Sequence, residues 1–121
     1  MNNAATKTAY KALKPQTVSA VLRKAGYKSA RAAERLGTYG FQTRRVNSWT
    51  VMVGLDDYTS DYSAESGEES RALYAEAIGV LLAAGLEPAM GFGEDTITGD
   101  AAIAQMKINA AGLWRLPVGA A

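Results

Sequence analysis

Residues 41–55 read FQTRRVNSWTVMVGL, and in this stretch the apolar side chains come to occupy every second position. From Trp49 to Leu55, the residues Trp49, Val51, Val53 and Leu55 alternate with Thr50, Met52 and Gly54. A period of two is typical of a strand with one buried face. Asn47-Ser48 favours a turn just before it. The stretch therefore predicts a β-hairpin of residues 41–46 and 49–55, with Trp49 packed in the core.

Two helices are predicted before this hairpin. Pro15, followed by apolar residues at spacings of three and four, indicates a helix that Gly26 ends. Ser29 is a candidate N-cap for a second helix over residues 30–36, and Gly37 is suited to end it in the left-handed conformation. The pair also fits a helix-turn-helix, although the second helix has no Asn or Gln placed to recognise adenine.

The chain after the hairpin begins with an acidic loop over residues 56–67. Ser66 and Glu69 form a capping-box pattern, which predicts a long helix that runs to Gly85. Residues 86–92 and 102–108 are then expected to be strands, the second because Ala104, Met106 and Ile108 alternate with polar residues. The apolar tail of residues 113–118 either docks on the domain or offers Trp114 to a partner or to another copy of the chain.

These elements predict an α+β fold with the order α-β-β-α-β-β. We expect a small, mainly antiparallel sheet with two main helices packed on one face. The 121 residues are enough for one hydrophobic core, so residues 15–121 are expected to form a single domain after a basic N-terminal arm of residues 1–14.

The composition limits the possible chemistry. The chain has no cysteine and no histidine, which removes disulfides, thiolate or imidazole metal ligands and every serine–histidine relay. We therefore expect a non-enzymatic protein without a metal or a cofactor. The apolar stretches are too short to cross a membrane, and residues 1–13 lack the apolar block of a secretory signal. These features predict a cytoplasmic protein that makes no membrane contact.

The charges are distributed unevenly along the chain. Residues 1–45 hold ten lysines and arginines against Glu34 alone, a net charge of +9, whereas residues 46–121 hold three against eleven carboxylates, a net charge of −8. Cations that recur every three or four positions are suited to a phosphate backbone, so nucleic acid is the first partner predicted. The candidate contacts are Lys7, Lys11, Lys14, Arg23, Lys24, Lys28, Arg31, Arg35, Arg44 and Arg45.

The uneven charge also fits two hypotheses that involve no nucleic acid. In the first, the basic segment folds against the chain's own acidic loop, which needs no partner. In the second, the chain is a protein–protein interaction module, either an inhibitor of a host factor that uses the acidic loop or a phage structural subunit that uses the apolar tail. The candidate protein-binding residues are then Asp56, Asp57, Tyr58, Asp61, Tyr62, Glu65 and Trp114.

Three segments within residues 16–90 carry a resemblance. They are the run from Thr17 to Tyr27, the pair Gly40-Phe41 at the start of a strand, and Tyr74-Ala75-Glu76-Ala77 leading to Leu82-Ala83-Ala84-Gly85-Leu86. In these segments the chain resembles small uncharacterised proteins of actinobacteria and their phages. The resemblance implies a phage or mobile-element accessory protein that acts in the host cytoplasm, and it supplies no catalytic residues.

Overall fold

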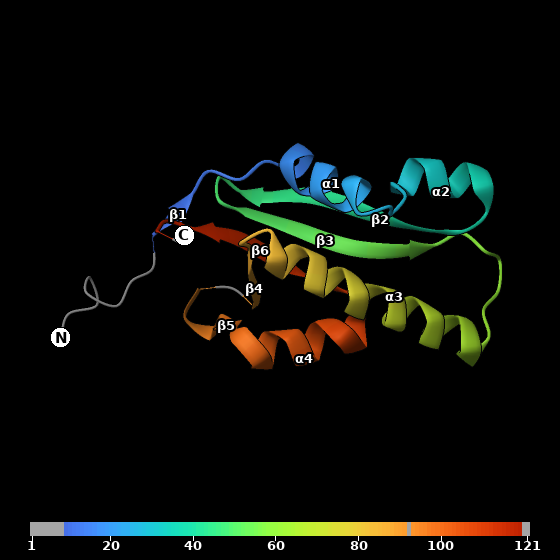
Figure 1. The fold of residues 1–121 in the computed structure, drawn as a ribbon. Helices are drawn as coiled ribbons and strands as arrows, with labels where there is room; N and C mark the ends of the chain where they lie inside the picture. Colours follow the sequence, from blue (N-terminus) through green and yellow to red (C-terminus); the bar gives the residue numbers. More distant parts are fainter. Residues whose placement is uncertain (1–8, 92, 120–121) are drawn as a thin grey trace.

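The structure is a computed structural model that describes residues 9–91 and 93–119. Its helices form one layer in front of a sheet (Figure 1). The elements in chain order are β1 (Tyr10–Lys11), α1 (Pro15–Lys24), α2 (Ala30–Leu36), β2 (Tyr39–Asn47), β3 (Thr50–Asp57), α3 (Ala64–Ala83), β4 (Glu87–Met90), the short 3-10 helix η2 (Gly93–Asp95), β5 (Ile97–Thr98), α4 (Gly99–Asn109) and β6 (Ala111–Pro117).

The sheet has six strands, and the described strands pair antiparallel throughout. The strand order is β2-β3-β6-β4-β5, and β1 pairs with the C-terminal end of β6. The central strand is therefore β6, where Leu113 lies opposite Met52 of β3 on one side and Ala89 of β4 on the other. The α+β class and the antiparallel sheet are confirmed.

The core lies between the sheet and the helices. Trp114 and Tyr74 are the two largest side chains with no exposed surface, and they are hydrogen-bonded to each other. The Trp114 Nε1–H donates to the Tyr74 hydroxyl at 3.3 Å, and that hydroxyl donates to the Val53 carbonyl at 2.9 Å. Around them pack Leu13, Val18, Leu22, Phe41, Val51, Ala77, Ile78, Leu81, Leu86 and Met106.

Helices α1 and α2 and the hairpin form where the sequence predicts them. Pro15 opens α1, and the Ser29 hydroxyl caps α2 by accepting the Ala32 N–H at 3.2 Å. Gly37 ends α2 with a φ of 68°. The hairpin strands β2 and β3 extend the predicted strands by a few residues at each outer end.

The predicted strand over residues 102–108 is wrong, because this segment lies within helix α4. Ala102 and Met106, one helical turn apart, are buried, whereas Ile108 is 70% exposed. The strand that completes the sheet is instead β6, in the segment that looked like an apolar tail.

The first turn of α3 also differs from the prediction. Ser63, not Ser66, is the N-cap: its hydroxyl accepts the Ser66 N–H at 3.2 Å, and the helix starts at Ala64. The Ser66–Glu69 pattern therefore lies inside the helix and does not form the expected capping box.

The basic arm expected over residues 1–14 is shortened by the sheet. Tyr10–Lys11 pairs with Leu116 and Pro117 of β6, and Leu13 is buried in the core. Residues 9–14 thus belong to the domain, while the rest of the expected arm lies outside the described residues.

We expect Gly40→Ala to lower the free energy of unfolding by about 1–3 kcal/mol. An added Cβ would lie 2.5 Å from the Ala33 Cβ and 2.6 Å from the Ser29 carbonyl oxygen, so α2 would have to move off β2. Gly79→Ala is the control, because a Cβ on this exposed α3 glycine meets nothing within 4 Å and should stabilise the helix by about 0.5–1 kcal/mol. Urea unfolding measures both. Equal effects of the two substitutions would contradict the proposed packing of α2.

We expect Tyr74→Phe to lower the free energy of unfolding by about 1–3 kcal/mol at neutral pH, because Trp114 Nε1 loses its acceptor. Burial raises the pKa of Tyr74 by more than the Trp114 hydrogen bond lowers it. The folded state therefore holds the proton more tightly, and stability should fall as pH rises above about 10, the pKa of an unfolded tyrosine. Urea unfolding at neutral and at alkaline pH should show a shallower fall in the variant. A variant as steep as the wild type would count against this assignment.

Candidate nucleic-acid interface

The cationic side chains predicted to contact nucleic acid are exposed wherever the structure describes them. Lys7 lies outside the described residues. The other nine lie in solvent: Lys11, Lys14, Arg23, Lys24, Lys28, Arg31, Arg35, Arg44 and Arg45. Their exposure meets the first requirement for binding a phosphate backbone, which is that the charges are reachable.

Six of these cations lie on α1, α2 and the edge strand β2, which run along one side of the molecule (Figure 1). Lys28 lies between the two helices, Lys14 just before α1, and Lys11 on β1. Arg31 and Arg35 are one turn apart on α2. Arg44 and Arg45 are neighbours on β2 and so point to opposite faces of the sheet. Arg45 lies opposite the buried Val51 on the helix side, and Arg44 lies opposite Met52 on the other side. The cations thus form a band along these elements that reaches both faces of the sheet at β2, and not a single cluster.

The carboxylates of the described residues are hydrogen-bonded mainly to hydroxyl groups. Tyrosine hydroxyls donate to Asp56, Glu69, Glu76 and Glu87, and serine or threonine hydroxyls donate to Asp57. No hydrogen bond from the nine described cations to any of these carboxylates is found. These contacts therefore do not support neutralisation of the basic segment by the acidic loop.

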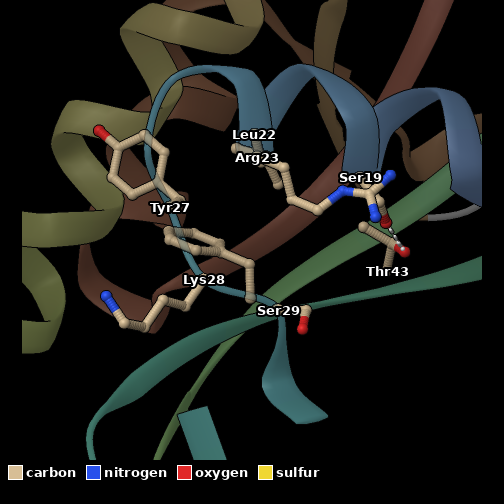
Figure 2. A pocket seen from close by; sticks show the side chains of 8 residues that line it. Ser19, Leu22, Arg23, Tyr27, Lys28, Ser29 and Thr43 are labelled. Carbon is tan, nitrogen blue, oxygen red and sulfur yellow. Dashed lines mark hydrogen bonds between the residues drawn. The ribbon is translucent and has the colours of Figure 1, made fainter. Parts of the chain in front are cut away.

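A small notch lies between α1, the α1–α2 connection and β2 (Figure 2). Ser19 and Thr43 form its polar end, where their hydroxyl oxygens are 2.7 Å apart. In Figure 2 the Arg23 side chain extends toward the end of the notch where this pair lies, whereas the Lys28 side chain extends the other way. Its volume of about 10 Å³ holds no more than one water molecule, so it is a surface contact point and not a ligand pocket.

Tyr27 borders the notch and packs against the core. Its ring meets Phe41 edge-on, with centroids 5.2 Å apart. Burial, and then the charge of Glu76 and its hydrogen bond, raise the pKa of Tyr27. A neutral phenol at this position is suited to packing and hydrogen bonding, not to acting as a base near neutral pH.

A second hollow, of about 220 Å³, lies where β4 and β6 meet the end of α4. Its lining includes Met52, Met90 and Leu113, and Asn109 contributes the one polar side chain in it. Within the described ranges, no three carboxylates come together as metal ligands. The larger hollow thus holds a single polar side chain, and the polar-lined notch is too small to enclose a substrate.

The acidic loop is organised by its own hydroxyl groups. The Tyr39 hydroxyl and the Ser66 Oγ are 2.7 Å apart, and the Ser66 Oγ donates to Asp57 at 2.9 Å. The hydrogen bonds from the Thr59 side chain and backbone, with that from Ser66, hold the pKa of Asp57 below its ordinary value against the effect of desolvation. The Ser66 bond lowers the pKa of Tyr39, but burial and the charges of Glu69 and Asp57 raise it more. This network joins α3 to the hairpin.

Six of the alternative protein-binding residues lie between the end of β3 and the start of α3, and Trp114 lies apart from them in β6. Trp114 is wholly buried in β6, so the tail docks on the domain, as one of its two predicted alternatives had it, and the assignment of Trp114 as a contact residue is wrong. Tyr58 is partly covered, and its hydroxyl donates to Asp56. The loop residues Asp57, Asp61, Tyr62 and Glu65 are exposed.

The structure also weakens the helix-turn-helix interpretation. Helix α2 has seven residues, and its one bulky apolar side chain, Leu36, is exposed. Helix α2 packs on β2 through the small Ala33, which lies against Gly40. A recognition helix needs a packed apolar side, which α2 lacks.

Sequence reasoning missed Trp49 as a surface residue. It lies in the two-residue turn between β2 and β3 and is 44% exposed, so its expected place in the core is wrong. Its N–H donates to the Asn47 Oδ1 at 3.0 Å. An asparagine that accepts a hydrogen bond from the second residue after it is a common turn signal, and it could have placed Trp49 in the turn.

Comparison with known proteins adds no assignment. No family model, no curated protein and no solved structure matches this chain. Among the described residues, no helix is both long and apolar enough to span a membrane.

Proposed function

We propose that this chain is a small non-enzymatic protein that binds nucleic acid through phosphate contacts of its basic N-terminal third. The observation that carries the proposal is that the nine candidate cations between Lys11 and Arg45 are all exposed. The carboxylates accept their hydrogen bonds from hydroxyl and backbone groups instead. A band of cations along α1, α2 and β2 matches an extended polyanion better than it matches a small ligand.

The proposal includes a phage or mobile-element origin and action in the host cytoplasm. Both rest on the resemblance to actinobacterial and phage proteins. The absence of histidine and cysteine supports a binding role over a catalytic one, since it removes the groups most often used for general base and nucleophilic catalysis.

We expect affinity for a labelled oligonucleotide, measured by fluorescence anisotropy, to fall steeply with salt. If about six or more cations contact phosphates, raising salt from about 50 to about 200 mM should weaken binding by about 10³-fold or more. Lys28→Gln/Arg31→Gln should lower the salt slope by about one unit for each cation removed. The matched control, Arg71→Gln/Lys107→Gln, removes one lysine and one arginine from exposed sites on α3 and α4 and should leave the slope unchanged.

Two results would overturn this proposal. The first is the absence of binding at the lower salt concentration. The second is an equal loss of affinity in the α3/α4 control, which would show that only the net charge of the chain matters.

The acidic loop supports a second candidate function, inhibition of a host protein. Tyr62 is 93% exposed and lies between Asp61 and Glu65, and an exposed aromatic side chain among carboxylates suits a basic protein surface. We expect a partner recovered with the wild-type chain and identified by mass spectrometry to be lost with Asp61→Asn/Tyr62→Ala/Glu65→Gln. Retention of the same partner by this variant would exclude the loop as the contact.

A further inference from the structure

The tip of the β2–β3 hairpin exposes one of the chain's two tryptophans. Trp49 occupies the turn and is 44% exposed, whereas Trp114 has no exposed surface. The hydrogen bond from the Trp49 N–H to Asn47 Oδ1 fixes the backbone of the turn. The sheet therefore holds a large aromatic side chain at its end, partly in solvent.

Cations border this turn on two sides. On one side, the Leu13 N–H donates to the Ser48 carbonyl at 3.0 Å, which places the segment containing Lys11 and Lys14 against the turn. On the other side, Arg44 and Arg45 of β2 come just before it. All four cations are exposed. Figure 1 shows β1, the start of α1 and the hairpin turn at the same end of the molecule.

Glu87 of β4 is a carboxylate that contacts this end, because its Oε1 accepts the Tyr10 hydroxyl at 2.7 Å. Arg115 lies over the Tyr10 ring, 5.1 Å from its centroid, and donates to its hydroxyl at 3.4 Å. Tyr10 thus connects Glu87 to Arg115, which is not one of the four cations that border the turn.

An exposed indole among cations matches the chemistry of a single-stranded nucleic acid. Unpaired bases stack on aromatic side chains whatever their sequence, and nearby cations bind the backbone phosphates. Bases in a duplex are already stacked on each other and cannot cover Trp49 in this way. Val46 and Val118 are also exposed, but an apolar protein surface would gain nothing from four neighbouring cations.

We propose that Trp49 stacks on an unpaired base, so that the hairpin tip gives this chain a preference for single-stranded over duplex nucleic acid. This inference rests on the proposed function. It adds the form of nucleic acid and names the residue that selects it.

The test compares anisotropy titrations of one oligonucleotide, single-stranded and annealed to its complement, at a single low salt concentration. Trp49→Ala should weaken single-strand binding by about 5- to 150-fold, the loss expected for one stacked base, and should leave duplex binding unchanged. Tyr62→Ala is the control, because it removes an exposed aromatic side chain from the acidic loop and should change neither affinity.

Tryptophan fluorescence gives an independent readout. Single strands should quench part of the wild-type emission, and Trp49→Phe, whose remaining tryptophan is the buried Trp114, should show no quenching. The Trp114 emission also reports whether this variant is folded.

Each outcome separates the two proposals. Salt-dependent binding with equal affinities for single strands and duplex, no quenching and no effect of Trp49→Ala would overturn the stacking inference and leave the proposed function standing. Absence of binding to either form would overturn both.

Discussion

The whole structure depends on the pairing of β6 with its neighbours. This strand bonds to β3 on one side, to β4 on the other and to β1 at its far end, so it joins three parts of the chain that have no other common strand. Trp114, at its middle, is hydrogen-bonded to Tyr74, which ties α3 to the same point. Because β1 is fixed to β6, Leu13 reaches Ser48 and the cations around it are held beside the hairpin turn. The geometry of the candidate interface thus follows from a strand that carries none of its cations.

Several cations of the band also have local effects that need no partner. Arg23 and Lys24 lie in the last turn of α1, and Arg35 lies in that of α2, where positive charge stabilises the helix dipole. Arg44 and Arg45, together with the irregular register after Arg45, protect the edge strand β2 from pairing with another chain. These effects leave the charged groups in solvent, so they are compatible with phosphate binding. Lys28 and Arg31 have no such local effect, so their exposure is stronger support for phosphate binding than that of the other cations.

The sequence predicted correctly those elements that depend on residues close together in the chain. The Ser29 cap, the Gly37 stop and the alternation after Trp49 each depend on neighbouring residues, and they gave α2 and the hairpin closely. Helix α4 was missed because its alternation of small and apolar residues also fits a strand, and because it ends at Ala110 with a φ of 53°, where glycine is the usual signal. Strand β6 was missed because its burial comes from distant partners. The uneven distribution of charge could be counted along the sequence, but the position of Trp49 beside Lys11 and Lys14 required the fold.

The place of β6 in the chain has a consequence for synthesis on the ribosome. The strand at the centre of the sheet is made after every strand it joins, so β3 and β4 emerge with a side that stays unpaired until residues 111–117 follow. Contacts between residues so far apart in sequence form slowly. During that interval the nascent chain presents open strand edges, which are the surfaces most prone to aggregation, and chaperones that cover such edges would increase the yield of folded protein.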